Sequence, residues 1–509
     1  MTFKRFPFIH LISILLLWFL FKLLPVFTHP AEAATANFIY AENFNQLKIW
    51  CFDSSNSLRF DDSSNYLYSL SIWALIHFFK LSTIAAAMLV NAISLFFTVY
   101  LIIRFIDSRF SSVNLLLVGL VFMSTQLWAG ILGDPVLFQG MLWLFAVHAF
   151  WKHRYWLLML WSAVNVMARP DNVFFVLPMI IASYADYNNL KERDQRKFIF
   201  GRVRRTINFF ILPLVVFFTY RYLYFGKILP YNWLHHALDA KNQHKWFHQA
   251  SYIQLKEYLA TYTLPLLIGI VFYFLKEYKK LPVRYYALAL SFLIIPMLYQ
   301  CTHIAEDNFG FKNQYSIYLG LIIFSLLFIR DFRSISQGFT TAIFVIFFGF
   351  KFSFLQFQQA LQSGFNNEYY IANDLAQINH GKAIVSNDNY ISWLTEWQIT
   401  FANGKHTKEG KRISVSELET SAADIILMDK TKDIAMLKEK YEVYLAPSST
   451  RQYEKQMEPE NSVDKFFYKY AHRLPVDKNQ YSQYLVWKFG NNYDAIKAIL
   501  LEHGAKQAL

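Results

Sequence analysis

Eleven apolar stretches recur through the first 357 residues, and they restrict the possible folds more than any other feature of the sequence. A helix needs about 20 mostly apolar residues to cross a bilayer, and these stretches are close to that length. With a hydrophobic content of 55%, they predict a polytopic α-helical membrane protein rather than a soluble core. The stretches lie at about 6–27, 82–104, 110–129, 135–151, 155–168, 171–186, 206–225, 258–276, 285–302, 314–330 and 338–357.

The basic residues are concentrated in short loops between these stretches. The formal net charge is +13, but Lys and Arg in such loops set the orientation of membrane helices, so no nucleic-acid partner is predicted. The chain has two cysteines, Cys51 and Cys301, which excludes a disulfide scaffold and a Cys-x-x-Cys metal site. Both are expected on the outer side, where a disulfide between them is one alternative.

The loop 187–205 fixes the predicted orientation, because it carries seven Lys and Arg residues and is therefore expected in the cytoplasm. If 65–80 lies on the membrane surface as an amphipathic helix, the other basic loops fall on the same side of the membrane as loop 187–205. If 65–80 crosses the membrane instead, the basic residues early in the chain fall on the outer side. The surface interpretation is favoured, and it predicts eleven spans with the N-terminus inside. The other basic loops contain Lys4 and Arg5, Arg104 and Arg109, Lys152 and Arg154, 276–284, and Arg330 and Arg333.

The first apolar stretch has an alternative interpretation. Ala31-Glu32-Ala33 follows it and is typical of a signal-peptide cleavage site, whereas Lys22 and the many later spans favour an uncleaved first helix.

The sequence predicts two domains. Residues 1–357 form the membrane domain, with a first outer loop over 28–80, and residues 358–509 are richer in charge and contain no stretch that could cross. Strands are predicted at 383–386, 423–428 and 441–445, and helices near 368–379, 431–440 and 492–503. This pattern predicts a small α/β domain on the outer side of the membrane.

Polar segments from distant parts of the chain are predicted to meet at the outer face. The first loop, over 28–64, holds five carboxylates and two basic residues, and a carboxylate there can take a proton from a hydroxyl group. By composition alone the loop offers four alternatives, which are Glu32, Asp53, Asp61 and Asp62. The other outer segments are 133–135, 169–171, 226–257 and 306–307.

Two short motifs at helix ends have competing interpretations. Arg169-Pro170-Asp171 is either an ion pair at a helix end or an arginine whose fork binds a lipid phosphate. Gly133-Asp134-Pro135 is either a helix start with a carboxylate that complements the dipole or a source of an acid for a site.

The loop after 225 is aromatic and basic, and contains Lys227, Tyr231, Asn232 and Lys241. Its aromatic residues are either membrane-interface anchors or part of a cover over a lipid phosphate and a sugar. His244 and His248 have the spacing of a metal pair but lack a third ligand.

The turn at Glu306 and Asp307 is either solvated or part of the same outer site. No Walker loop, dinucleotide-binding glycine motif, Gly-x-Ser-x-Gly or His-Glu-x-x-His is present.

Several stretches resemble motifs of one enzyme family. Glu32–Asn43 resembles a loop opening with paired aspartates before an aromatic segment, and Ala129–Asp134 resembles a Gly-Leu-Glu stretch. Ala168–Asp171 resembles Arg-Pro-Glu, Tyr224–Pro230 resembles Tyr-Phe-Gly-x-x-Leu-Pro, and Ile304–Phe309 is similar to Gly-Gly-Asp-Phe. In this order they resemble the integral-membrane GT-C glycosyltransferases, in the arabinofuranosyltransferase-like branch.

The chain departs from the family pattern at two positions. Ala33 stands where the second acid is expected, and Tyr231 stands where asparagine is common.

The resemblance implies a transferase of the bacterial inner membrane with a periplasmic C-terminal domain. It implies transfer of a sugar from a polyprenyl-phosphate donor to an envelope glycan, lipid or protein, without a nucleotide sugar and in some members with a divalent cation. Glu32 is the expected base, Arg169 binds the leaving phosphate, and Asp134 and Asp171 orient sugar hydroxyls or the arginine. The expected substrate-binding residues are Lys227, Tyr231, Asn232, Lys241 and Asp307.

Two other classes of function fit the same pattern. One is a flippase or transporter of a lipid-linked sugar, although such proteins usually place ionisable residues near the middle of the membrane. The other is a non-enzymatic assembly protein that presents its C-terminal domain.

Overall fold

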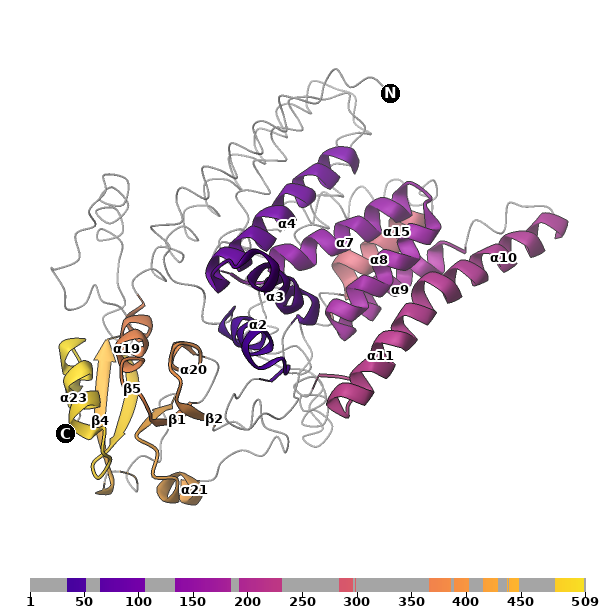
Figure 1. Cartoon of the computed structure of the whole chain (residues 1–509). Helices are drawn as coiled ribbons and strands as arrows, with labels where there is room; N and C mark the ends of the chain where they lie inside the picture. The colour runs from indigo at the N-terminus through magenta and orange to yellow at the C-terminus, as the bar shows by residue number, and fades with distance from the viewer. Residues whose placement is uncertain are drawn as a thin grey trace, which may run out of the picture.

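Among the residues that the structure describes, the regular elements up to residue 295 are helices, and a mixed sheet with short helices follows from residue 366 (Figure 1). The computed structural model describes residues 34–51, 65–105, 133–184, 192–230, 283–295, 298, 366–385, 389–401, 415–428, 437, 439–447 and 481–507. The structure is therefore predominantly helical, with a small sheet in the C-terminal region, as the sequence predicts.

A group of apolar helices forms the central part of the molecule. α7 and α8 make a hairpin that turns at residues 152–154, where His153 has a positive φ of 55°. α4 packs beside α7 and α9 packs beside α8, and α9 also contacts α15. Their bounds are α4 Thr83–Phe105, α7 Val136–Trp151, α8 Tyr155–Ala168, α9 Val173–Ala182 and α15 Val283–Ala289. These helices confirm the predictions at 82–104, 135–151 and 155–168.

One long helix lies along the edge of this group (Figure 1). It comprises α10 (Glu192–Thr206), a π-helical turn (Ile207–Ile211) and α11 (Leu212–Phe225). Its segment Ile199–Phe225 has 27 residues, and at about 1.5 Å per residue it exceeds the thickness of a bilayer core. Within the described ranges it is the one straight helix long and apolar enough to cross a membrane.

The remaining apolar helices do not meet that length on their own. α3 (Tyr66–Phe79) and Thr83–Thr98 of α4 do so only together, and they are bent by 118° at the break between them. α7, α8 and Pro170–Ala182 are shorter. The predicted number of eleven spans stays a prediction, since the stretches 6–27, 110–129, 258–276, 314–330 and 338–357 and the last part of 285–302 lie outside the described residues.

α2 (Thr35–Leu47) runs parallel to α3. The Ser69 hydroxyl donates to Asn37 Oδ1 at 2.9 Å, and Asn45 Oδ1 lies 3.2 Å from His77 Nδ1, so equal steps along the two helices keep them in register. α3 begins at Asn65, whose side chain accepts the N–H of Tyr68 as a helix cap.

Six strands form the C-terminal sheet in the order β2-β1-β3-β5-β4-β6. β1 is parallel to β2 and β3, and the pairs β3–β5, β5–β4 and β4–β6 are antiparallel. The strands are β1 Lys382–Val385, β2 Gln398–Phe401, β3 Ile425–Met428, β4 Tyr441–Pro447, β5 Tyr481–Trp487 and β6 Lys506–Gln507. The helices are α19 Asn367–Leu375, α20 Tyr390–Leu394, α21 Val415–Thr420 and α23 Tyr493–Glu502.

Both faces of this sheet are covered. Alternate residues of a strand point to opposite faces, so Ala383 and Val385 join one core while Ile384 joins the other. The first core contains residues of α19 and α23, and the second contains Leu418 of α21.

The first core also extends beyond the predicted domain boundary. Ala36, Ile39 and Tyr40 of α2, together with Trp50 and Tyr66, belong to the same buried cluster as Ile371 and Tyr484. Near the C-terminus of α2, Phe44 packs against this cluster as well. The first outer loop therefore shares a core with the C-terminal region.

The strands predicted at 383–386, 423–428 and 441–445 are confirmed as β1, β3 and β4 within one or two residues. The helices predicted near 368–379 and 492–503 are confirmed as α19 and α23. β2, β5, β6, α20 and α21 were not predicted, and the stretch 431–440 lies mostly outside the described residues.

Candidate functional site

The candidate site lies at the end of the bundle where α7 begins and α8 ends. The α7–α8 hairpin brings Asp134 and Arg169, the residues just outside these helices, to the same end. The N-terminus of α3 reaches this end through hydrogen bonds to Gly133 and to Gln139 of α7. Three segments predicted to converge, the first loop, 133–135 and 169–171, therefore do so in the structure.

A tyrosine and an asparagine hold the start of α7. The Tyr68 hydroxyl donates to the carbonyl of Gly133 at 2.7 Å, and Asn91 Nδ2 donates to both the Tyr68 hydroxyl and the carbonyl of Asp134 at 3.0 Å. Gly133 has φ +94°, and a Cβ there would lie 2.6 Å from Phe38 Cζ. The turn before α7 is therefore fixed by α2, α3 and α4 together.

A row of buried amides connects the first loop to the Arg-Pro-Asp turn. Asn65 Nδ2 donates to Gln139 Oε1 at 3.1 Å, and Gln139 Nε2 donates to Asn165 Oδ1 at 3.2 Å. Asn172 Nδ2 donates to the carbonyl of Asn165 at 2.9 Å, and the N–H of Asn172 donates to the carbonyl of Arg169 at 3.1 Å. All four amide residues are at most 3% exposed.

These amides make the turn rigid. A buried amide without a partner is costly, and one that is satisfied helps to specify a single arrangement. We name Asn65, Gln139, Asn165 and Asn172 the amide row.

Arg169 and Asp171 form a bidentate ion pair. Arg169 Nε lies 3.1 Å from Asp171 Oδ1 and Nη2 lies 2.6 Å from Oδ2, and the side chains are 16% and 3% exposed. The helix-end pairing predicted as one alternative is therefore present. The same pairing fixes the plane and direction of the guanidinium, which is what an anion-binding arginine requires.

Asp134 caps the start of α7. Its Oδ1 accepts the N–H of Val136 at 2.9 Å, which agrees with the helix-start interpretation. The residue is 8% exposed, and in the described part of the chain Oδ2 accepts no hydrogen bond. Both carboxylate oxygens of Asp171 and Oδ1 of Asp134 already accept hydrogen bonds, so Oδ2 of Asp134 is the carboxylate oxygen of these two described residues that is left for a ligand.

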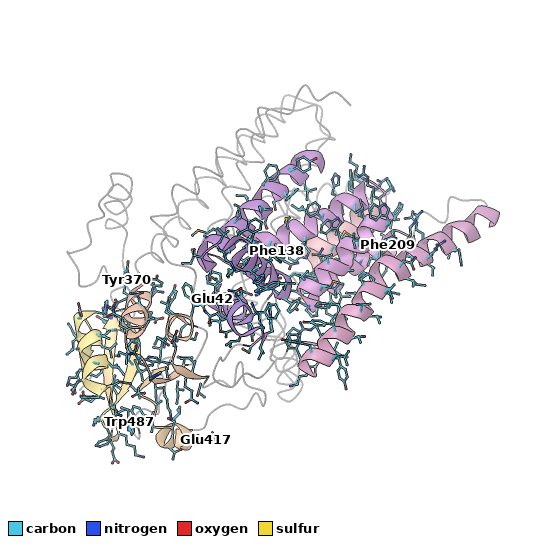
Figure 2. The ribbon with its side chains drawn as sticks, viewed as in Figure 1. Glu42, Phe138, Phe209, Tyr370, Glu417 and Trp487 are labelled. Atoms are coloured by element: carbon cyan, nitrogen blue, oxygen red, sulfur yellow. The ribbon has the colours of Figure 1, made fainter. Side chains whose placement is uncertain are left out.

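Glu42 is an acid that sequence reasoning did not select. It lies on α2, on the side toward the C-terminal region (Figure 2), and its carboxylate accepts hydrogen bonds from the Thr83 hydroxyl and the Trp393 side chain. Burial raises the pKa of this carboxyl above its ordinary value. Thr83 lies eight residues before Asn91 on α4, which is about 12 Å along the helix, so Glu42 sits away from Asp134.

Lys227 lies at the end of α11 that contacts the first loop. It is half-buried and follows Gly226, and the Tyr224 hydroxyl three residues earlier accepts the N–H of Trp50 at 3.1 Å. The other predicted site residues, Glu32, Tyr231, Asn232, Lys241 and Asp307, lie outside the described residues, as do His244, His248 and Cys301. Cys51 is buried.

No group of three or more His, Cys, Asp or Glu in the described ranges could hold a metal ion. The described part of the site instead offers an arginine held by a carboxylate, a second carboxylate, and amides that fix both turns. Such a set can bind an anion and orient hydroxyl groups.

Sequence reasoning missed the amide row, although a signal for it exists. Gln139 and Asn165 interrupt apolar stretches predicted to cross the membrane. Polar side chains at such positions are costly unless they hydrogen-bond to each other, which they do here.

The basic residues gather at the opposite end of the bundle. The turn 152–154, the segment 202–205 of α10 and Arg284 of α15 meet there, through Arg202 over the ring of Tyr155 and a 2.9 Å hydrogen bond from Arg284 to His153. Three loops assigned to one side from their charge are thus neighbours in space.

Comparison with known proteins gave no match. No protein-family model, no curated protein and no solved structure matches the chain.

Proposed function

We propose that this chain is a membrane glycosyltransferase that transfers a sugar from a polyprenyl-phosphate donor to a cell-envelope acceptor. The observation that carries the proposal is the amide row, which joins the first loop to the Arg169–Asp171 pair, while Tyr68 and Asn91 hold the Asp134 turn at the same end. Helices that only anchored the chain in a membrane would not need to hold polar segments together that are far apart in the sequence. A site that binds and orients a substrate does need such a rigid arrangement.

Arg169 is the group that binds the phosphate of the donor. When the acceptor oxygen attacks the anomeric carbon, the bond from that carbon to the phosphate oxygen breaks and negative charge grows on the leaving phosphate. A guanidinium held in place by Asp171 stabilises this charge without having to reorient. Asp171 then acts as a positioning residue.

Asp134 accepts a hydrogen bond from a sugar hydroxyl through Oδ2. The acceptor hydroxyl loses its proton to a carboxylate of the first loop, for which Glu32 stays the prediction from the family register. Glu42 does not suit that role, because Thr83 and Trp393 already occupy its carboxylate.

The proposed orientation places the candidate site and the C-terminal region on the periplasmic side of a bacterial inner membrane. It is supported by the basic residues of the 152–154 turn, α10 and α15 at the far end of the bundle, since Lys and Arg flanking membrane helices remain in the cytoplasm. Eleven spans with the N-terminus inside, and a GT-C-like arrangement, belong to this proposal.

The test is substitution of Arg169 in the purified full chain. Release of polyprenyl phosphate from a panel of labelled polyprenyl-phosphate sugars should fall about 100-fold or more in Arg169→Ala, as for loss of one charge-stabilising donor. Arg169→Lys should recover only part of the rate, because lysine lacks the fork. Lys506→Ala, on the exposed strand β6, is the control; an unaltered rate in Arg169→Ala rules out the assignment.

A lipid-linked sugar flippase is the alternative. Gln139 lies three residues after the start of α7 and Asn165 three residues before the end of α8, so the amide row stays near one end of the bundle. Transporters place their sites near the middle of the membrane, which favours the transferase. Alternating labelling of the first loop from both sides would favour the flippase instead.

A further inference from the structure

A histidine and a tyrosine organise the basic end of the bundle. Arg284 Nη1 donates to His153 Nε2 at 2.9 Å, and His153 Nδ1 donates to the Tyr155 hydroxyl at 2.6 Å. Arg284 also lies over the ring of Trp151, 5.3 Å from its centre, and Arg202 lies over the ring of Tyr155. Two arginines are therefore held around the His153–Tyr155 pair.

Several cations near this pair form no ion pair within the part of the chain that the structure describes. Five of them form no ion pair with any residue that the structure describes, in contrast to Arg169, which Asp171 engages through both oxygens. Like charges gathered at one end of the bundle repel each other unless an anion is bound among them. These five, which we call the basic cluster, are Lys152, Arg154, Arg204, Arg205 and Arg284.

Large apolar side chains are exposed directly beside the basic cluster. On α10, Phe200 is 72% exposed and Val203 is 40% exposed. Trp156 of α8 is 46% exposed, and the centre of its ring lies 5.8 Å from the centre of the Phe209 ring. Apolar surface next to a group of cations matches a ligand with a charged head and hydrocarbon tails. It does not match a free ion or a nucleic acid.

We infer that the basic cluster binds the phosphate headgroup of an anionic phospholipid, whose acyl chains lie against Trp156 and the exposed face of α10. The inference rests on the membrane placement given under the proposed function, and not on the transfer reaction. A lipid bound here joins the α7–α8 turn, α10 and α15, which are brought together through His153 and Tyr155.

The test is a titration of the purified full chain, in a neutral detergent, with phosphatidylglycerol or phosphatidylcholine, read by native mass spectrometry. The wild type should bind phosphatidylglycerol in preference to phosphatidylcholine. Arg204→Gln/Arg205→Gln should raise the apparent Kd for phosphatidylglycerol about fivefold for each charge removed. Arg284→Gln should do the same, whereas Arg284→Lys keeps the charge and should keep most of the affinity.

The control removes two exposed lysines at the other end of the molecule, Lys48→Gln/Lys80→Gln, and should leave the affinity unchanged. Equal binding of the two lipids, an equal loss in the control, or displacement of the lipid by inorganic phosphate at similar concentration would overturn the inference. The two proposals can fail separately. If the cluster variants lose lipid binding as expected but the wild-type chain transfers no sugar, only the proposed function is contradicted.

Discussion

Gly133 connects backbone geometry to the candidate site. Its φ of +94° is in the region that favours glycine, and its carbonyl accepts the hydroxyl of Tyr68. Phe38 of α2 packs where a side chain would stand. The position of Asp134, the next residue, therefore depends on the absence of a side chain at 133.

Gly133→Ala should destabilise the folded chain by about 2–4 kcal/mol, because it adds backbone strain to a steric conflict with Phe38. Gly226→Ala is the matched control: Gly226 also has a positive φ, +71°, but a Cβ there meets nothing within 4 Å. The control should lose only about 1 kcal/mol. Thermal unfolding of the purified proteins measures both, and equal losses would show that the contact with Phe38 does not matter.

α2 connects two parts of the structure at the scale of elements. Ala34, Phe38 and Ala41 point into the cluster formed with α4 and α7, whereas Ile39 and Tyr40 point into the sheet core. Trp393 of α20 packs against both clusters and lies edge-on to Phe38 at 5.4 Å. Glu42 completes this contact through its bonds to Thr83 and Trp393.

The raised pKa of Glu42 predicts a pH dependence of this contact. The folded chain holds the proton more tightly than the unfolded chain, so stability falls as the pH rises from the ordinary value of 4.5 through the folded pKa, and is constant above it. Glu42→Gln should remove this dependence with little loss at neutral pH. Glu42→Ala should lose about 1–3 kcal/mol, since Trp393 and Thr83 lose a partner.

Thermal unfolding of the wild type and both variants across this pH range measures the effect. If the wild type and Glu42→Gln changed in parallel with pH, the dependence would have to come from another group.

Element identity was largely predictable, but the pairing of elements was not. Apolar stretches such as 135–151 and 155–168 predict α7 and α8 closely, because a long and mostly apolar run indicates a helix without reference to its partners. β2 has four residues and β6 has two, and such short strands are stabilised by neighbours distant in the sequence.

The same limit applies to the site. The sequence indicated Arg169 and Asp171 and both interpretations of them, whereas the amide row depends on how three helices are placed. The role of Glu42 depends on Trp393, which is about 350 residues away, and no local pattern reports such a contact.

The whole molecule has two chemically different ends. Acids, amides and the C-terminal sheet lie toward the end with Asp134 and Arg169, while several cations that form no ion pair with a described residue lie near His153 at the other. A membrane between the two ends would place each in the environment that suits it.

Cysteine labelling tests this arrangement in intact cells. In a chain with Cys51 and Cys301 replaced by serine, Phe489→Cys should react with a membrane-impermeant maleimide from outside, and Val203→Cys only after permeabilisation. Both native residues are exposed, so accessibility alone does not separate them. Reaction of both from the same side would contradict the orientation.

The core that α2 shares with the sheet also affects how the chain is made. Ile39 and Tyr40 leave the ribosome early, yet their packing partners between Ile371 and Leu500 are synthesised last. At typical elongation rates this wait lasts on the order of tens of seconds. During that time one side of the newly made segment stays uncovered, so maturation of this protein depends on protecting that side until its partners are synthesised.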